Sequence, residues 1–339
     1  MERIEKTIVD KAVELGYESC GIIGVDEVSD FADKLRERIE KAPGNDDFYG
    51  SFFCFANLRE EFPWAKSLVV CIVKYGVYRL PEHLDGLIGK HYLTDIRSDE
   101  HCKEYKFSVA FEEYLQSLGM KVETNRMFGV TSMRWAAFKA GLGIIRKNNF
   151  FYTDSGSWIH IEGFLTDREM EFKQTPNQKP CPQDCKLCFS ACPTKSLSEP
   201  YTMSPAVCVS PLSVREADLI NSPESANMGR WVYGCDTCQD ACPFNAGKWL
   251  QIEDFPGLEN LGNALTLESI VKMDYTSLTE LLASKFFYID KERMWQWKLN
   301  ALNAMCNSYE EKYLDTIKLA LNDEEERVRQ MAAWVLSKV

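Results

Sequence analysis

Eight of the thirteen cysteines in this chain lie between Cys181 and Pro243, in two groups that each end in Cys-Pro. The first group reads Cys181-x3-Cys185-x2-Cys188-x3-Cys192-Pro193. The second group reads Cys235-x2-Cys238-x3-Cys242-Pro243, with Cys208 upstream as its fourth member. Cysteine thiolates in runs of this kind bind cubane 4Fe–4S clusters. The pattern therefore predicts two such clusters and a protein that transfers electrons.

The assignment of cysteines to clusters follows from the way in which two-cluster proteins are built. In them the last cysteine of one motif binds the cluster of the other motif. On that rule the first cluster is bound by Cys181, Cys185, Cys188 and Cys242. The second is bound by Cys192, Cys208, Cys235 and Cys238. Structural zinc is the alternative, since four-thiolate zinc also uses Cys-x2-Cys pairs, but zinc does not require Cys-x2-Cys-x3-Cys-Pro twice.

Length and cysteine use limit what else the chain can be. At 339 residues it exceeds the usual size of one domain, so we expect two or three modules, each with its own core. No run approaches about 18 apolar residues, and the N-terminus lacks the order of a signal peptide, which predicts a cytoplasmic protein without membrane contact. Reducing thiol pools there oppose a disulfide framework. The remaining cysteines are expected to be small buried hydrophobic residues: Cys20, Cys54, Cys71, Cys102 and Cys306.

The net charge of the chain disfavours binding to nucleic acid. Lysine and arginine total 39 against 51 acidic residues, which gives a net charge of −12. A surface of this sign repels polyanions unless a basic face is segregated on it. No basic run in the sequence supplies such a face, and mixed stretches such as 34–41 are typical of solvated helices.

The N-terminal part of the chain alternates between helical and extended patterns. We expect helices over 2–16, 103–118 and 133–140, and extended segments over 20–24, 121–124 and 157–165. The apolar run 67–73 is typical of a strand that is buried inside a sheet. The helix over 133–140 ends at Gly141-Leu142-Gly143, where glycines let a flat ligand or a neighbouring chain approach closely. The first ~175 residues therefore predict an α/β or α+β domain.

The rest of the chain divides at a polar loop near residue 176 and again where helical patterns begin. The predicted organisation is an α/β domain over 1–175, a double-cluster domain over 176–255 and a helical tail over 256–339. In the tail, helices over 314–321 and 328–336, preceded by one over 298–307, are typical of a HEAT-type pair. The chain as a whole is thus expected to be of the α+β class.

With these motifs in view, the chain resembles the epoxyqueuosine reductase family, cobalamin-dependent iron–sulfur enzymes related to reductive dehalogenases. The resemblance is carried by the following segments: Tyr233 to Pro243, Ala191 to Thr194, Cys208 to Ser210, Ala140 to Gly143, Lys147-Asn148, Gly156 to Trp158, Leu165 to Asp167 and the closing helical pair. It runs the length of the chain and is sparse before residue 130. Such a resemblance implies an N-terminal domain that holds a base-off corrinoid, a ferredoxin-like two-cluster domain that reduces it, and a HEAT-like tail.

The resemblance also assigns residues to the cofactor and a role to an acid. It places the corrinoid cradle in or next to segments that carry the resemblance. The residues are Gly141, Leu142, Gly143, Arg146, Lys147, Asn148, Ser157 and Trp158. It implies reductive chemistry in which the clusters supply electrons to cobalt and an aspartate donates a proton.

The chain departs from the family pattern at two positions. Where the family has its proton-donating aspartate, an ungapped alignment places Met127. Residues that could donate the proton instead are Tyr92, His101, Tyr105 and, with a shift of register, Glu123. The family's Gly-Lys-Asn has become Arg146-Lys147-Asn148, and that arginine could bind an anionic substrate, bind a corrin amide or point to solvent.

These observations predict an iron–sulfur oxidoreductase, a cobalamin-dependent reductase with an altered proton-donor site that acts on a small molecule. Its electrons would come from a soluble donor such as ferredoxin or flavodoxin. One alternative is an electron-transfer or reductive-activator protein whose N-terminal domain binds a partner. The other is true epoxyqueuosine reduction in tRNA queuosine synthesis with a relocated acid.

Overall fold

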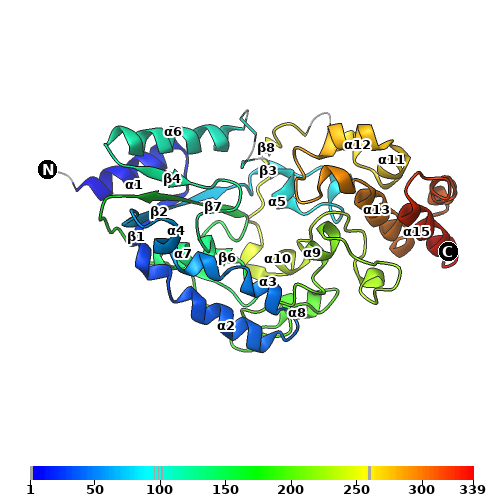
Figure 1. Ribbon diagram of the computed structural model, residues 1–339, viewed down its shortest axis with the longest axis horizontal. Coiled ribbons are helices and arrows are strands. Elements are labelled where there is room, and N and C mark those ends of the chain that lie inside the picture. Colours follow the sequence, from blue (N-terminus) through cyan, green and yellow to red (C-terminus); the bar gives the residue numbers. More distant parts are fainter. Residues whose placement is uncertain (1–2, 95, 98, 101, 259–260) are drawn as a thin grey trace.

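The computed structural model describes residues 3–94, 96–97, 99–100, 102–258 and 261–339. Figure 1 shows an elongated molecule with a sheet and its helices at the N-terminal end and a group of helices at the C-terminal end. The segments that carry the eight cysteines, around α8, α9 and α10, lie between these two parts. The cluster region is therefore in contact with both ends of the chain.

The N-terminal part is built on one four-stranded sheet. Its order is β1 (Ser19–Gly24), β2 (Ser67–Lys74), β7 (Ile159–Thr166) and β4 (Val122–Thr124). All three pairings are antiparallel, with Val70 opposite Gly163 at the centre. The extended segments predicted at 20–24, 67–73, 121–124 and 157–165 are thus confirmed as strands of a single sheet.

Helices cover both faces of this sheet, so its central strand is apolar throughout. On one face α1 (Ile4–Leu15) and α6 (Lys103–Ser117) bury residues such as Ile8 and Phe111 against it. On the other face α4 (Leu58–Glu61) and α7 (Met133–Lys139) bury Leu58, Ala136 and Ala137. Burial on both sides explains the unbroken run of buried residues in β2, which is unusual for an antiparallel strand. The predicted helices at 2–16, 103–118 and 133–140 are confirmed.

Shorter elements complete this part and the cluster region. The helices are α2 (Phe31–Lys41), α3 (Asp46–Gly50), α5 (Lys90–Leu93), α8 (Leu187–Ala191), α9 (Val209–Val214) and α10 (Thr237–Asp240). The strands are β3 (Tyr78–Arg79), which pairs in parallel with β8 (Glu253–Asp254), and β5 (Ile144–Ile145), which pairs with β6 (Phe151–Tyr152). The β3–β8 pair joins the N-terminal part to the chain that leaves the cluster region.

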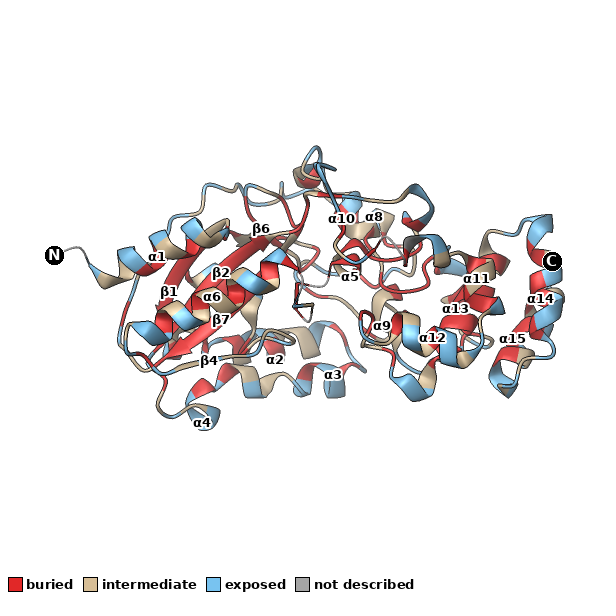
Figure 2. Ribbon diagram, turned by 90° about the horizontal axis from the view of Figure 1, so that it is seen from above, coloured by how far each residue is buried: buried red, intermediate tan, exposed pale blue. Residues whose placement is uncertain are grey.

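The C-terminal part consists of helices packed on one another. They are α11 (Leu267–Lys272), α12 (Tyr275–Leu282), α13 (Trp295–Asn307), α14 (Leu314–Ala320) and α15 (Glu326–Leu336). Figure 2 shows that α13 is buried along nearly its whole length, whereas α14 and α15 keep exposed faces. Trp295 and Trp297 belong to the core of this part, since they are 7% and 0% exposed.

The core of the C-terminal helices extends into segments that are distant in sequence. It includes Tyr75, Tyr78, Leu84, Leu87 and Leu93 from the region after β2, together with Val209 and Tyr233 from the cluster region. Residues 75–93 therefore pack with the second half of the molecule. This shared core holds the cluster region at a defined position relative to the sheet.

Two further sequence expectations can be compared with the structure. Cys20, Cys71 and Cys102 are fully buried, as expected of small hydrophobic residues, but Cys54 is exposed and Cys306 is half-buried. The expectation was wrong for Cys54, because it lies on a surface turn between α3 and α4. Among the helices of the described residues, none combines the length and apolar character needed to cross a bilayer.

Candidate functional site

The structure brings the first predicted set of cysteines together around one small cavity. Cys181, Cys185, Cys188 and Cys242 all line it, with Arg146, Lys147, Asn148, Leu187, Pro243 and Phe244 as the other lining residues. Cys242 belongs to the later motif and lies more than 50 residues after Cys188 in the sequence. In the structure it lies with the three cysteines of the earlier motif. Burial, together with Cys181, Cys242 and Cys185, raises the pKa of Cys188 to about 11.

The second predicted set is also gathered in one place, deeper in the molecule. Burial raises the pKa of Cys238 well above its usual value, and the thiols of Cys235, Cys208 and Cys192 add to the shift. Burial likewise raises the pKa of Cys235 to about 12. These four thiols are close enough to repel one another as thiolates, and iron bound at the site would remove that cost by taking up the negative charge.

Both arrangements fit cubane clusters. Each set offers four thiols, the donor number of a 4Fe–4S cubane, and one cysteine in each set comes from the other motif. No group of three or more His, Cys, Asp or Glu side chains in the described part of the chain has the spacing of a single-ion site.

The loop after β5 ties the sheet to both cysteine sets. The ammonium of Lys147 donates hydrogen bonds of 2.8 Å to the carbonyl oxygens of Pro182 and Gln183. The side-chain amide of Asn148 donates to the carbonyl oxygen of Cys238 at 3.1 Å. These bonds explain why a cation and an amide occupy adjacent positions of the loop: they satisfy carbonyl groups of two cysteine turns.

Of the three sequence interpretations of Arg146, the one in which it points to solvent is wrong. Its side chain is 2% exposed, so it does not point to solvent. Its Nη1 is 3.8 Å from the sulfur of Cys181, and its guanidinium lies over the ring of Phe244. The side chain is thus part of the first cysteine site.

The glycines assigned to a corrinoid cradle are used instead for contacts within the chain. Gly141 has φ +73°, and a Cβ atom there would come within 1.8 Å of the carbonyl oxygen of Gln174. A Cβ atom on Gly143 would come within 2.2 Å of the carbonyl oxygen of Tyr152. A neighbouring segment of the chain, one of the two partners that the sequence allowed, lies against both glycines.

The other residues assigned to that cradle are also engaged. Leu142 is buried in the core beside the sheet. The backbone N–H of Ser157 donates to Asn245 Oδ1 at 2.8 Å, and its hydroxyl donates to Gln239. Trp158 is 2% exposed and packs on Trp249. These contacts join the sheet to the cluster region.

These contacts lead to an expected result for Gly141. Replacing it by alanine should destabilise the protein by at least about 1–2 kcal/mol, because an L-residue is strained at this φ and its Cβ would overlap Gln174. The melting temperature should fall equally with and without added cobalamin. Gly50, which has open space around it, is the control position. A variant of normal stability that has lost only cobalamin binding would show that Gly141 serves the cofactor.

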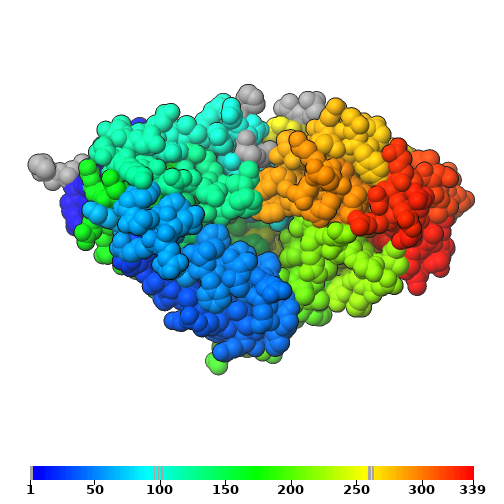
Figure 3. Space-filling model, viewed as in Figure 1, coloured from blue at the N-terminus to red at the C-terminus, as the bar shows by residue number. Residues whose placement is uncertain are grey.

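A separate cavity of about 570 Å³ lies at the edge of the sheet, beside β4. Its lining residues come from β4 and the loop after it, from α4 and its flanking turns, and from α6 and the segment before it: Phe55, Glu61, Phe62, Arg97, Tyr105, Glu123, Thr124, Asn125, Arg126, Met127, Gly129 and Val130. Figure 3 shows the surface hollowed between the N-terminal part and the C-terminal helices. Met127, the residue at the position of the family's aspartate, lines this cavity.

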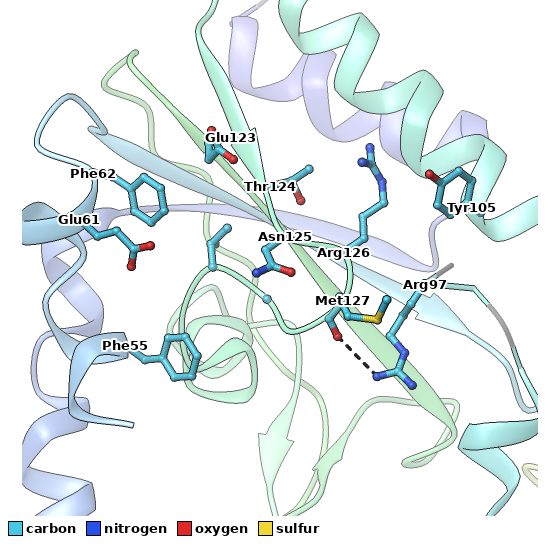
Figure 4. Close-up of a pocket in the computed structure, with 12 residues that line it drawn as sticks. Phe55, Glu61, Phe62, Arg97, Tyr105, Glu123, Thr124, Asn125, Arg126 and Met127 are labelled. Carbon is cyan, nitrogen blue, oxygen red and sulfur yellow. Dashed lines mark hydrogen bonds between the residues drawn. The ribbon is translucent and has the colours of Figure 1, made fainter. Parts of the chain in front are cut away.

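The charged residues of the cavity lining are two arginines, Arg97 and Arg126, and two glutamates, Glu61 and Glu123. Figure 4 shows Arg97 beside Met127. Nη1 of Arg97 donates a hydrogen bond of 3.5 Å to the carbonyl oxygen of Met127. Arg97 is largely buried and also donates to the hydroxyl of Tyr288 at 3.2 Å. Arg126 points toward α6, where its Nε donates to the hydroxyl of Ser108 at 2.8 Å. The cavity therefore combines charges of both signs with aromatic surfaces, which suits a polar group.

The structure separates the residues that were predicted as proton donors. Tyr105 and Glu123 line the cavity, and Glu123 stands on β4 away from Met127. Tyr92 lies against the second cysteine set, with its hydroxyl 3.2 Å from that of Ser210, and burial raises its pKa to about 12. His101 falls outside the described residues.

Several residues near the sites were not predicted from the sequence. Arg97 belongs to no sequence motif, and only the folded structure shows that it lines the cavity. His91 and His160 stack at 5.7 Å, and burial lowers the pKa of His160 to about 3, so it is neutral. Lys90 pairs with Asp240 at 2.6 Å beside the second cysteine set. Phe244 could have been noted as an aromatic residue directly after Cys242-Pro243.

Comparison with known proteins agrees with this geometry. Residues 181–245 match the model of a 4Fe-4S double cluster binding domain. An epoxyqueuosine reductase of Vibrio cholerae is 30% identical over 338 residues, which are 96% of this chain and 89% of that protein. One of Synechocystis sp. is 33% identical over 65% of this chain and 78% of its own length.

Solved structures share the fold over nearly the whole chain. An epoxyqueuosine reductase with a modified tRNA-Tyr stem loop has a TM-score of 0.77 at 21% identity, covering 99% of this chain and 90% of that one. The Bacillus subtilis enzyme, with its aspartate-bearing catalytic loop swung out of the active site, has a TM-score of 0.76 with the same coverage. The Vibrio cholerae relative and the cysteine domain together show that the chain belongs to the epoxyqueuosine reductase family and is a reductase with two 4Fe–4S clusters.

Proposed function

We propose that this protein passes electrons through its two clusters to a small molecule bound in the cavity at Met127. One observation carries the proposal: Met127, at the position of the family's aspartate, lines a cavity of about 570 Å³, next to arginines and aromatic rings. The first cluster would be held by Cys181, Cys185, Cys188 and Cys242, and the second by Cys192, Cys208, Cys235 and Cys238. When bound, such clusters accept and release single electrons.

A chain of side chains connects the second cysteine set with the cavity. Ser210, two residues after Cys208, contacts the hydroxyl of Tyr92. The ring of Tyr92 packs edge-on against that of Tyr288, and the hydroxyl of Tyr288 accepts a hydrogen bond from Arg97 in the cavity. These contacts support a direction of electron flow in which the second cluster is the one nearer the substrate.

The first cysteine set lies nearer the surface and is the proposed point of contact with a donor. Cys181 and Cys185 are half-buried, and Leu187 between the cysteines is 52% exposed. Exposed lysines surround it at 179, 186 and 195, although the chain as a whole carries a net charge of −12. An apolar centre with a basic rim suits an acidic, soluble electron carrier of the ferredoxin or flavodoxin type.

The proposal of a small-molecule substrate rests on the absence of an acidic side chain at residue 127 and on the net negative charge of the chain. Met127 cannot donate a proton, so the reaction of the family's tRNA substrate would need another acid here. The acidic surface also disfavours a polyanion. The second candidate, reduction of epoxyqueuosine in tRNA, is favoured by the fold shared with a relative that was solved with a modified tRNA stem loop.

Cobalamin belongs to the proposal through the family resemblance. The residues to which that resemblance points are engaged in contacts within the chain, so no step is assigned to the corrinoid here. Titration of the anaerobic protein with cobalamin, followed by loss of the base-on spectrum, should show binding near one equivalent. A protein with both clusters and no such binding would remove cobalamin from the proposal.

The domain proposal is a sheet domain over 1–175, a double-cluster domain over 176–255 and a HEAT-like tail over 256–339. Residues 75–93 share the core of the tail, which supports a tight connection between the parts. Packing of α13 with α15 and of α14 with α15 supports a stacked helical arrangement in the tail.

The test uses anaerobic protein with both clusters reduced and two probes, the free epoxyqueuosine nucleoside and a stem loop that carries it. Reduction of the epoxide to the alkene consumes a pair of electrons and a pair of protons and releases water. We expect the nucleoside to reoxidise the clusters and to be converted at least as fast as the stem loop. Faster conversion of the stem loop would establish the tRNA candidate, and conversion of neither probe would indicate an electron carrier.

Met127 gives a sharper form of this test. If the cavity is the reaction site, Met127→Asp should raise the turnover of the nucleoside roughly 10²-fold, the usual contribution of a positioned general acid. Phe128→Asp places the same carboxylate one residue away, on a side chain that is 60% exposed, and should leave the rate unchanged. Equal effects of the two variants would place the reaction elsewhere.

A further inference from the structure

Arg146 is a buried cation at the first cysteine set. Its guanidinium carbon lies 3.4 Å from the centre of the Phe244 ring and 5.0 Å from that of Tyr152. Its Nη1 is within hydrogen-bonding distance of sulfur, 3.8 Å from Cys181 Sγ. The guanidinium is thus enclosed by two aromatic rings and directed at a cluster ligand.

No carboxylate balances this charge among the residues that the structure describes. None of their ion pairs includes Arg146, and its buried Nε has no hydrogen-bond partner. A buried guanidinium without a counter-charge is costly. The thiolate of Cys181 and the cluster that it binds are the negative groups within reach, so they compensate Arg146.

The second cysteine set has a different electrostatic environment. The buried cation beside it is Lys90, whose ammonium lies 2.6 Å from Asp240 and 3.8 Å from Asp236. These carboxylates neutralise Lys90, so its field at the second cluster is small. Arg146 is therefore the buried cation that contacts a ligand of the first cluster directly.

We propose that Arg146 raises the reduction potential of the first cluster, so that this cluster takes an electron from the soluble donor more readily. In that step the donor is oxidised, the cluster is reduced and gains one negative charge, and no bond is broken. The buried guanidinium stabilises the more negative state, since net charge and hydrogen bonds to sulfur set cluster potentials. The low dielectric between the rings of Phe244 and Tyr152 strengthens the effect.

The proposal concerns a residue of this chain, because the family resemblance implies a glycine at the position of Arg146. The proposal rests on the two clusters and is independent of the substrate and of cobalamin. Its failure would therefore leave the proposed reductase activity unaffected.

The test is an anaerobic redox titration of both clusters, followed by electron paramagnetic resonance. Arg146→Gln keeps a polar side chain and removes the charge, and it should weaken the electron affinity of the first cluster roughly tenfold, which is about 59 mV for a one-electron couple. The second wave should not move. Cys185→Ala, which should retain only the second cluster, identifies the two waves.

Three comparisons complete the test. Arg146→Lys keeps the charge and should stay close to the wild type, whereas Lys195→Gln removes an exposed cation and should move neither wave. Phe244→Leu opens the guanidinium to water and should lower the same wave, which decides the matter if Arg146→Gln does not hold its full iron content. The proposal is overturned if the first wave stays in place in Arg146→Gln and Phe244→Leu, or if Arg146→Lys moves it as far as Arg146→Gln.

Discussion

Replacing Cys242 by alanine is expected to remove the cluster of the other motif. Cys242 lines the same small cavity as Cys181, Cys185 and Cys188, although Cys235 and Cys238 are its neighbours in sequence. A cubane that loses one of its four thiolates is generally not retained. Cys242→Ala should therefore hold about half of the iron, with the second cluster intact.

The spectra of paired variants distinguish this from ligation within each motif. After anaerobic reconstitution, Cys242→Ala should give the same electron paramagnetic resonance spectrum and midpoint potential as Cys185→Ala. In the same way Cys192→Ala should match Cys235→Ala. Cys306→Ala, at a half-buried cysteine outside both sets, should keep all of the iron. A Cys242→Ala spectrum that matched Cys235→Ala would show that the motifs do not cross.

The second large effect is expected at Glu162, whose carboxyl group is buried on strand β7 of the sheet. Burial raises its pKa from 4.5 to about 7, although the hydroxyl of Tyr17 donates a hydrogen bond of 2.5 Å to its Oε2. The folded state therefore binds a proton that the unfolded state has already released between pH 4.5 and about 7. The contribution of this group to the free energy of unfolding is complete below pH 4.5. It falls by about 3 kcal/mol in all as the pH rises to 7.

Glu162→Gln isolates this contribution, because glutamine resembles the neutral acid and does not titrate. The melting temperatures of variant and wild type should agree at pH 5, and the variant should melt roughly 5 °C or more above the wild type at pH 8. Glu123→Gln, at an exposed carboxyl group on β4, should show no difference that depends on pH. A Glu162→Gln variant that is equally stable to the wild type at pH 8 would contradict a neutral carboxyl group in the folded protein.

The electron path and the cavity are linked by groups that the sequence presents far apart. Arg146, on the loop after β5, reaches the first cysteine set, and Arg97, before α6, reaches the cavity. Both side chains are largely buried and lie over aromatic rings, Phe244 and Phe287 respectively. The protein thus places one cation at the proposed entry point of electrons and another in the cavity proposed for the substrate.

Local patterns were sufficient for the strands, the helices and the cluster ligands. Three patterns depend on residues that are close in sequence. They are the apolar run over 67–73, the helical pattern of α6 and the spacing of cysteines before proline. They report on backbone conformation and ligand chemistry, which neighbouring residues largely determine. The proton donor could not be found in this way, since the family position holds Met127 and no local pattern marks a replacement.

The roles of the loop residues required the three-dimensional arrangement. Gly141 and Gly143 were compatible with a flat ligand or with a neighbouring chain, and only the position of Gln174 and Tyr152 shows that they meet backbone. The sequence left the environment of Arg146 open, and the contacts that the structure shows are with Phe244 and Cys181, about 98 and 35 residues away along the chain.

The sequence by itself therefore determined that this protein holds two 4Fe–4S clusters and resembles the epoxyqueuosine reductases, because metal ligation depends on residue type and short spacing. The tertiary structure alone decided where Arg146 lies and which residues surround Met127, and it brings the predicted set of cysteines to one cavity. Those features arise from contacts between segments distant in sequence, whose positions are fixed by packing against the shared core.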